Sequence, residues 1–547
     1  GKDDLGYQTS GQVAGLALQA GRPVKLVLGR EESMMASYKR EPMTIGFKLG
    51  TDAEGNLQAA KVEMLADSGC FSSQSTLAML RASLHAAGAY RYRAVHVDTL
   101  AVYTNNGFSG AFRGFGNTDA AAAIEQAIDD LAHQLGRDPL DFRLQNCVQQ
   151  GDRFMSGNVV DHEIKLAECL QWVREKSDWD RKRAAFGAMA ADASPHGNLQ
   201  RGIGVACYMH GSSLGGEGAD YANTTLKIED DYGITLTSGL TDYGQGSRTV
   251  FTLIAAETLG VAPKRIHMLR PDTDTAIESG PTVASRSTML GGNATQVAAE
   301  KLDRLLRYAA ASILECPPAQ VTRHGEIYVN PDEDEASFEE VVDRARAMGL
   351  TLSVQGKWSM PHIEWHVETG TGTPYYCYTF GAQVAEVEVD RRIGQVRVLN
   401  IWAAHDGGTI VFPQGAYGQM YGGIAQGLGY GLLEEMTYHH GYPQALNYDE
   451  YLIPTSLDVP EIEATYIETD FPEGPYGAKN LAEPVLVATA PAIANAVFHA
   501  TGVRHHTLPL TLERVLLGHD LHSSRGETAC RRALGFKEAG VEVIWQT

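Results

Sequence analysis

Gly110-Ala-Phe-Arg-Gly-Phe-Gly116 is the stretch at which the pattern of this 547-residue sequence changes. Before it, apolar and polar residues alternate, for example in 24–28 (VKLVL) and 60–65 (AKVEML), and this alternation predicts β-strands. After it, from Ala120 to Leu135, apolar residues recur at helical spacing and predict a helix with one apolar face. A glycine-rich loop between strands and a helix predicts a mixed α+β fold.

The alternation of strands and helices continues to about residue 515. Helices are expected at 139–146 and 164–176, strands at 203–209, 223–229 and 233–238, and another helix from Ser247. The polar segment 193–202, which contains Pro and Gly, is the best candidate for a domain boundary by composition. The chain is long enough for more than one hydrophobic core, and 519–547 has no long apolar stretch.

The charge and hydropathy of the sequence argue against two classes of partner. The formal net charge is −22 and Lys and Arg form no cluster, so the positive field that binds nucleic-acid phosphates is missing. No apolar run has the roughly 18 residues that span a bilayer. Apolar-leaning stretches of that length, such as 485–501, are rich in Ala, Pro and Asn and predict buried helix. We therefore expect no nucleic-acid partner and no membrane segment.

The seven cysteines are scattered, and no two form a C-x-x-C pair. This pattern favours neither a disulfide framework nor a cysteine-ligated zinc or iron–sulfur site, and it fits a protein of the reducing cytoplasm. The sequence begins at Gly1 with neither Met nor a signal peptide, so we expect upstream sequence to belong to the working protein.

The 58 glycines cluster in a few short loops, which let a backbone approach a ligand closely. Loop 242–249 (DYGQGSRT) follows a strand and opens a helix, so its N–H groups are candidates for holding an anion, with an ordinary turn and helix cap as the alternative. It lacks the third Gly of a dinucleotide motif, and no phosphate-binding G-x-x-x-x-G-K-[ST] occurs, which disfavours NAD and ATP. Further glycine-rich segments lie at 280–288, 422–429 and 474–484.

Together these segments resemble the xanthine dehydrogenase and aldehyde oxidase family of molybdenum hydroxylases, from residue 1 to about 515. The A-F-R-G-F-G run at 111–116, G-Q-G at 244–246 and G-A-K-x-x-x-E-P at 477–484 carry the resemblance. It implies an α+β, two-domain molybdopterin-binding subunit with mixed sheets and flanking helices. The remainder of the first domain would be 1–165, the second domain 166–515 with the catalytic Glu, and a C-terminal extension 516–547. This sequence has Ala482 where the family usually has Gly.

The resemblance implies a molybdenum–molybdopterin cofactor, with the cytosine dinucleotide form as an open alternative. The metal would be held through the pterin, with no metal ligand from the protein. The implied cofactor contacts are Gly1, Phe112, Arg113, Gly244, Gln245, Gly246, Ala284, Ser285, Arg286, Ser287, Thr288 and Lys479. Fe2S2 clusters and FAD are expected on partner subunits or domains, because this chain lacks a cysteine pattern for clusters. The N-terminal part of the catalytic subunit is a further expected partner.

Glu483 is the catalytic base that the resemblance implies. The chemistry needs a group that removes a proton from a metal-bound hydroxide, and a carboxylate suits this task when burial lifts its pKa toward neutrality. Pro484 biases the preceding residue toward an extended backbone. Considered without the resemblance, a carboxylate that caps the apolar helix starting near Leu486 is the alternative.

Four further residues are candidates for contact with a substrate. Arg81 resembles the position at which xanthine dehydrogenases hold a purine oxygen, with a surface or helix-terminal Arg as the alternative. Asp3 falls where they carry a substrate-contacting Glu, and it is one methylene shorter. Phe115 and Tyr208 are candidates for an aromatic clamp around a ring.

The resemblance therefore favours hydroxylation of a purine or related N-heterocycle, with water as the oxygen donor, hydride passed to molybdenum and electrons to iron–sulfur and flavin partners. An aldehyde dehydrogenase or an aromatic thioester reductase on the same scaffold is the alternative within the enzymes. A non-catalytic, truncated or assembly-stage subunit is the alternative outside them. Carbon monoxide oxidation is disfavoured, because the relatives with that activity carry Cys at the position of Gly110.

Overall fold

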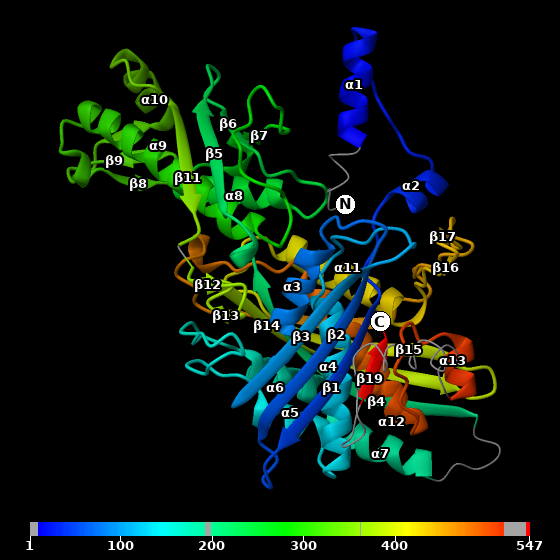
Figure 1. The fold of residues 1–547 in the computed structure, drawn as a ribbon. Coiled ribbons are helices and arrows are strands. Elements are labelled where there is room, and N and C mark those ends of the chain that lie inside the picture. The colour runs from blue at the N-terminus through cyan, green and yellow to red at the C-terminus, as the bar shows by residue number, and fades with distance from the viewer. Residues whose placement is uncertain (1–8, 192–197, 362, 519–542, 547) are drawn as a thin grey trace.

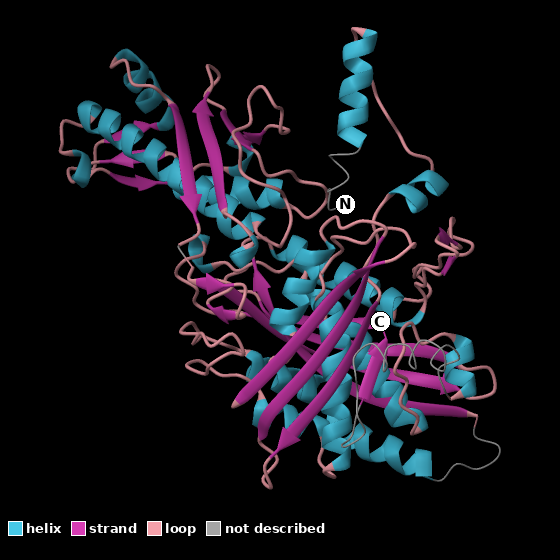
Figure 2. Cartoon of the chain, in the orientation of Figure 1, coloured by secondary structure: helices cyan, strands magenta, loops and turns pink. Residues whose placement is uncertain are grey.

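A computed structural model describes residues 9–191, 198–361, 363–518 and 543–546. Its longer strands form three four-stranded sheets, in the orders β19-β1-β2-β3, β11-β5-β6-β7 and β18-β15-β14-β4. Each sheet combines antiparallel pairs with one parallel pair, and helices pack between and beside the sheets (Figures 1 and 2). The predicted α+β class with mixed sheets is therefore confirmed.

The first sheet lies across the lower front of the molecule in Figure 1 and packs on three helices. Its strands are β1 (Met43–Thr51), β2 (Leu57–Gly69), β3 (Ala94–Tyr103) and β19 (Val543–Gln546), and its helices are α3 (Ser75–His85), α4 (Asn117–Gln134) and α5 (Pro139–Asn146). Gly116 immediately precedes α4 and has a φ of 83°, and a Cβ there would lie 2.2 Å from the carbonyl oxygen of Ala78. Only glycine allows α3 and α4 to approach this closely.

The sheet β18-β15-β14-β4 forms the second layer of the core. Its strands are β4 (Leu199–Ser212), β14 (Cys377–Asp390), β15 (Gln395–Asp406) and β18 (Glu461–Ile467), and its helices are α6 (Leu166–Ser177), α7 (Trp179–Ala191), α11 (Pro413–Leu432) and α12 (Thr489–Thr501). Helix α12 packs closely on β4, because a Cβ at Gly204 would lie 2.2 Å from the backbone nitrogen of Ala496. This packing fixes the end of the loop that carries Glu483.

The third sheet forms a lobe at the upper left of Figure 1 with its own hydrophobic core. Its strands are β5 (Tyr221–Ile228), β6 (Ile234–Ser238), β7 (Ile266–Met268) and β11 (Ser353–Ser359), covered by α8 (Ser247–Leu259), α9 (Gly292–Ile313) and α10 (Phe338–Ala347). The remaining elements are α1 (Gly11–Ala20), α2 (Arg30–Ala36), α13 (Leu512–Leu517), β8 (Thr322–His324), β9 (Ile327–Val329), β10 (Glu335–Ser337), β12 (Trp365–His366), β13 (Thr371–Gly372), β16 (Tyr438–His439) and β17 (Tyr442–Pro443).

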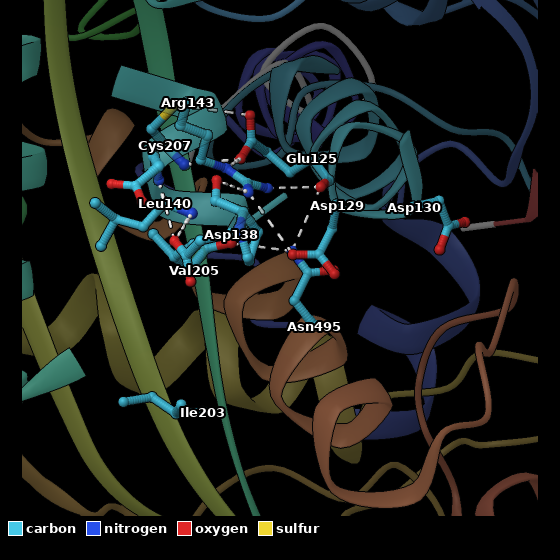
Figure 3. Close-up of polar contacts among 12 residues, drawn as sticks. Glu125, Asp129, Asp130, Asp138, Leu140, Arg143, Ile203, Val205, Cys207 and Asn495 are labelled. Atoms are coloured by element: carbon cyan, nitrogen blue, oxygen red, sulfur yellow. Dashed lines mark hydrogen bonds and ion pairs between the residues drawn. The ribbon is translucent and has the colours of Figure 1, made fainter. Parts of the chain in front are cut away.

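A buried polar network joins α4, α5, β4 and α12 (Figure 3). Arg143 donates to the Glu125 carboxylate (Nε–Oε2, 2.8 Å), which also accepts from the backbone of Cys207 (2.9 Å). Asn495 of α12 donates to the carbonyl oxygen of Val205 (3.0 Å). Because α4 follows the Arg113 loop and α12 follows the Glu483 loop, this network sets the relative position of two segments of the site described below.

Most predicted elements are confirmed: the helices at 120–135, 139–146, 164–176 and from Ser247, and the strands at 60–65, 203–209, 223–229 and 233–238. The strand predicted at 24–28 is wrong, because this segment has no hydrogen-bonded neighbour among the described residues. In the described residues one helical stretch, Pro484–Thr501, is long and apolar enough to cross a membrane, but 83% of it is buried, as predicted for 485–501. The core of the first sheet includes residues on both sides of residue 165, and the division into domains stays a prediction.

Candidate active site

A cavity of about 420 Å³ lies where four glycine-rich segments and one helix meet. The segments are the loops at 111–113, 243–247, 282–288 and 480–483, and the helix is α11, which contains the 422–429 segment. The structure thus brings together segments that are hundreds of residues apart. Of the predicted set, the residues that line the cavity are Phe112, Arg113, Gly244, Gln245, Ala284, Ser285, Ser287, Thr288 and Glu483.

Glu483 is buried, with 2% of its surface exposed, in the wall of this cavity. Its Oε2 accepts a hydrogen bond from Ser285 Oγ (3.0 Å), and its Oε1 accepts one from the backbone N–H of Gly114 (3.3 Å). The residue has φ −90° and ψ −43°, so the extended backbone predicted from Pro484 is wrong. It makes no side-chain capping hydrogen bond to the short helix Pro484–Leu486, which removes the helix-cap alternative. The carboxylate is therefore held at a cavity by groups from two other loops.

Arg113 joins three segments of the cavity wall. Its Nε donates to the carbonyl oxygen of Ala482 (2.7 Å), and its two terminal nitrogens reach Gln426 Oε1 (3.4 Å) and the carbonyl oxygen of Gln419 (3.2 Å). Burial lowers the pKa of Arg113 to about 10, so the guanidinium remains charged near neutral pH. A planar guanidinium with several donors is well suited to connecting such acceptors.

Ala284 and Ser285 both have left-handed backbone conformations, with φ of 54° and 49°. Such angles are unfavourable for residues with a Cβ, and they occur preferentially where surrounding structure holds them at functional sites. One such restraint is visible, since the backbone N–H of Ser213 donates to the carbonyl oxygen of Ala284 (2.9 Å). The loop at 284–285 is thus a strained part of the cavity wall.

Several backbone N–H groups of the loop around Gln245 already donate to a carboxylate of the same loop. The Asp242 carboxylate accepts from the backbone N–H groups of Gly244 (2.8 Å), Gly246 (3.5 Å) and Arg248 (2.9 Å). Gly246 begins α8 and does not line the cavity. The side-chain carboxylate of the loop itself therefore fills the concave backbone site.

Besides Gly246, two predicted cofactor contacts lie outside the cavity lining, and each of their side chains forms a buried ion pair. Arg286 pairs with Asp220 (Nε–Oδ1, 2.7 Å) and also donates to backbone carbonyl oxygens. Lys479 pairs with Asp406 (Nζ–Oδ2, 2.9 Å), and burial raises the pKa of the Asp406 carboxyl group. A charge in the interior requires a partner, and these carboxylates provide it. These two side chains are therefore held inside the protein, and their assignment as cofactor contacts stays a prediction.

Three predicted substrate contacts, Arg81, Phe115 and Tyr208, also lie outside the cavity lining. Arg81 is fully buried and pairs with Glu217 (2.8 Å), so the surface alternative is wrong, and the contact with a purine stays a prediction. Phe115 packs in a small cluster with Tyr38, Ala78, Phe108 and Ala111. Tyr208 belongs to another core, where its hydroxyl lies 2.7 Å from Nδ1 of His405. Phe115 and Tyr208 thus belong to different hydrophobic clusters, and the aromatic clamp stays a prediction. Gly1 and Asp3 lie outside the described residues.

Three amide side chains in the cavity wall were not predicted: Gln419, Gln426 and Asn480. Gln419 and Gln426 are seven residues apart on α11, which places them on the same helix face two turns apart. Asn480 Oδ1 accepts from the backbone of Met289 (3.2 Å), while its buried Nδ2 has no hydrogen-bond partner among the described residues. Gln426 lies within the glycine-rich segment 422–429, and Gln419 precedes it by seven residues. This helical spacing was the one feature of the sequence that could have indicated both glutamines.

Comparison with known proteins gives consistent matches along the chain. Residues 1–147 and 172–460 match two family models, both described as molybdopterin cofactor-binding domains. The xanthine dehydrogenase molybdenum-binding subunit of Escherichia coli O157:H7 is 31% identical over 90% of this chain and 64% of the relative. The structure of the aldehyde oxidoreductase from Desulfovibrio gigas matches with a TM-score of 0.81 and 28% identity, over 93% of this chain and 52% of that chain.

The quinoline 2-oxidoreductase from Pseudomonas putida 86 matches with a TM-score of 0.82 and 25% identity, over 93% of this chain and 66% of that chain. The chain therefore spans about half to two thirds of the length of these relatives.

Proposed function

Because this chain belongs to the molybdopterin-binding subunit family of xanthine dehydrogenases and aldehyde oxidoreductases, we propose that it forms the catalytic part of a molybdenum hydroxylase with Glu483 as the base. The observation that carries this proposal is the position of Glu483. Its carboxylate is buried in the wall of a cavity formed by the segments that the family resemblance marks as cofactor loops.

The cavity residues fit a pterin cofactor. The volume of about 420 Å³ lies within the range of small-molecule sites. A pterin has both donors and acceptors along its ring edges, and the lining offers neutral amide and hydroxyl groups from Gln419, Gln426, Asn480, Ser287 and Thr288. The Nδ2 of Asn480, which has no partner within the described part of the chain, is a buried donor that a ligand acceptor would satisfy. The Asp242 carboxylate already accepts from the backbone N–H groups of Gly244 and Gly246, so these two groups are not available to a ligand.

The chain's own residues supply positioning and proton transfer. When bound, the molybdenum cofactor supplies an acceptor for two electrons and an activated water-derived oxygen. Glu483 takes up a proton at its carboxylate, which Gly114 and Ser285 hold in a fixed orientation. Arg113 fixes the backbone immediately before Glu483 through the Ala482 carbonyl oxygen. The walls formed by α11 and the strained loop at 284–285 limit how the substrate approaches.

The proposed substrate is an N-heterocycle whose electron-poor carbon is hydroxylated with oxygen from water. Relatives named xanthine dehydrogenase and quinoline 2-oxidoreductase support this class. An aldehyde is the second candidate, supported by the relative named aldehyde oxidoreductase and by the Arg81–Glu217 pair, which engages the guanidinium that favoured a purine over an aldehyde. Electrons would pass to iron–sulfur and flavin centres on partner subunits, as relatives named molybdenum-binding subunits suggest.

The test is Glu483→Gln in the molybdenum-loaded, assembled enzyme, assayed with purines, quinoline and aldehydes. We expect kcat to fall about 10²- to 10⁴-fold while the bound molybdenum, measured by mass spectrometry, is unchanged. Glu473→Gln, at an exposed position ten residues earlier, is the control. Retention of normal turnover by Glu483→Gln would refute the assignment of the base.

A further inference from the structure

Ser285 and Glu483 form a reciprocal pair of hydrogen bonds across the cavity wall. Ser285 Oγ accepts from the backbone N–H of Glu483 (3.0 Å) and donates to Oε2 of the same residue (3.0 Å). One hydroxyl therefore contacts both the backbone and the carboxylate of Glu483. This arrangement fixes the direction of the side chain relative to its own backbone, because rotation of the carboxylate would break the second hydrogen bond.

The left-handed conformation at 284–285 is part of this arrangement. It is connected to a buried ion pair behind the cavity: Arg81 Nη2 donates to the carbonyl oxygen of Ser213 (2.8 Å), and the backbone N–H of Ser213 donates to the carbonyl oxygen of Ala284 (2.9 Å). Ser213 is itself left-handed, with φ 72°. The connected residues thus run from Arg81 through Ser213 to the residue that precedes Ser285.

The ion pair at the start of this path is rigidly held. Glu217 Oε1 accepts from Arg81 Nε (2.8 Å) and from the hydroxyl of Tyr375 (2.9 Å). The guanidinium also lies 5.0 Å from the centre of the Tyr375 ring. Both charged side chains are buried, so displacement of either one would leave the other without its partner.

We propose that Ser285 is the positioning residue for Glu483, and that the Arg81–Glu217 pair maintains the strained backbone that places its hydroxyl. The inference rests on the proposed role of Glu483 as the base. Ser285 does not touch the reacting atoms in this scheme. It orients the carboxylate and, as a donor to the ionised form, stabilises that form against protonation.

Three variants of the molybdenum-loaded enzyme distinguish the effect of the Ser285 hydroxyl from the effect of the backbone conformation at 284–285. Ser285→Ala removes the hydroxyl and keeps a residue that disfavours the left-handed conformation. Ser285→Gly also removes the hydroxyl, but it relieves the strain of that conformation. Glu217→Gln weakens the ion pair behind the loop without altering the cavity lining. Ser68→Ala serves as the control, because it removes another buried serine hydroxyl, one without a hydrogen-bond partner among the described residues.

For Ser285→Ala and Ser285→Gly alike we expect kcat/KM to fall about 10- to 100-fold and the acid limb of its pH profile to move up by about one pH unit. Glu217→Gln should move this limb in the same direction by less, and Ser68→Ala should not move it. Hydrogen exchange followed by mass spectrometry provides a readout that does not depend on turnover. It should show faster exchange at the backbone amide of Glu483 in the two Ser285 variants.

An unchanged acid limb in Ser285→Gly, with a changed one in Ser285→Ala, would show that only backbone shape matters and would overturn the inference. Normal exchange at the Glu483 amide in both variants would also overturn it. The proposed function fails separately, through a fully active Glu483→Gln enzyme, whatever the Ser285 variants show.

Discussion

Arg113 Nε donates a hydrogen bond to the carbonyl oxygen of Ala482 at 2.7 Å, and this contact joins residues 369 positions apart. Ala482 is the residue immediately before Glu483, so the guanidinium fixes the backbone from which the proposed base extends. The same guanidinium reaches α11 through Gln419 and Gln426. One side chain therefore connects the loop at 111–116 to the loop at 480–483 and to α11.

Arg113→Lys should lower both activity and stability, although it preserves the charge. A lysine has a single ammonium group and does not reach the carbonyl oxygen of Ala482 and α11 together. We expect kcat/KM to fall about 10- to 100-fold, and the free energy of unfolding to fall by about 1–3 kcal/mol. Steady-state kinetics and thermal unfolding measure these effects. Arg392→Lys, at an exposed arginine that pairs with Asp390, is the control. Equal effects in both variants would contradict the role of the planar guanidinium of Arg113.

Gly114→Ala tests the close packing of the same loop. Gly114 has φ 91°, which strains any other residue, and a Cβ there would lie 2.0 Å from Thr118 Oγ1, so the Thr118 side chain or the loop has to shift. We expect this change to displace the N–H that donates to Glu483 Oε1. We expect a loss of stability of more than about 1 kcal/mol together with reduced turnover. Gly349→Ala is the matched control, since Gly349 has φ 71° and a Cβ there would meet no described atom within 4 Å. If both variants lose the same stability and neither loses activity, backbone strain alone explains the result.

The sequence predicted the segments of the site better than the partners of individual side chains. Glycine-rich segments have a local signature, and all five predicted segments contribute residues to the cavity lining. The burial of Arg81, Arg286 and Lys479 has no such signature. Each is neutralised by a carboxylate distant in sequence, and a pattern of residue types does not distinguish a charge held by a ligand from one held by Glu217, Asp220 or Asp406.

The fold shows the same division between local and long-range information. Helix α4 was predicted because its apolar spacing is a property of one short segment. Residues 24–28 alternate like a strand, but a strand also requires a neighbour, and the described residues supply none there. Gln419 was missed because a single glutamine in a helix carries no signal until Gln426, two turns later, is seen to face the same cavity.

Stability should decrease as the pH falls below about 6.5, in part because of His405. Burial, and to a smaller extent the charge of Lys479, lowers the pKa of His405 to about 3. The pKa of a histidine in the unfolded chain is about 6.5. Unfolding therefore takes up a proton below about pH 6.5, so the contribution to stability is complete above that pH and is lost progressively as the pH falls toward about 3. Thermal unfolding between pH 7.5 and 5 measures the slope.

His405→Gln retains an acceptor for the nearby Tyr208 hydroxyl and should reduce this slope by up to about 1.4 kcal/mol per pH unit. His96→Gln, at an exposed position, is the control. An unchanged slope in His405→Gln would show that the imidazole does not remain neutral in the folded protein.

The network in Figure 3 predicts that a second substitution rescues the damage of the first. Arg143→Met leaves the Glu125 carboxylate buried beside the backbone of Cys207 without its cation, which should cost about 3–5 kcal/mol of unfolding free energy. Adding Glu125→Gln removes the uncompensated charge but keeps an acceptor for Cys207, so the double variant should recover more than half of the loss. Asp129 retains its pair with Arg504 (2.7 Å) in both variants. Denaturant unfolding measures each step, and a double variant no more stable than Arg143→Met would show that lost packing, rather than unpaired charge, dominates.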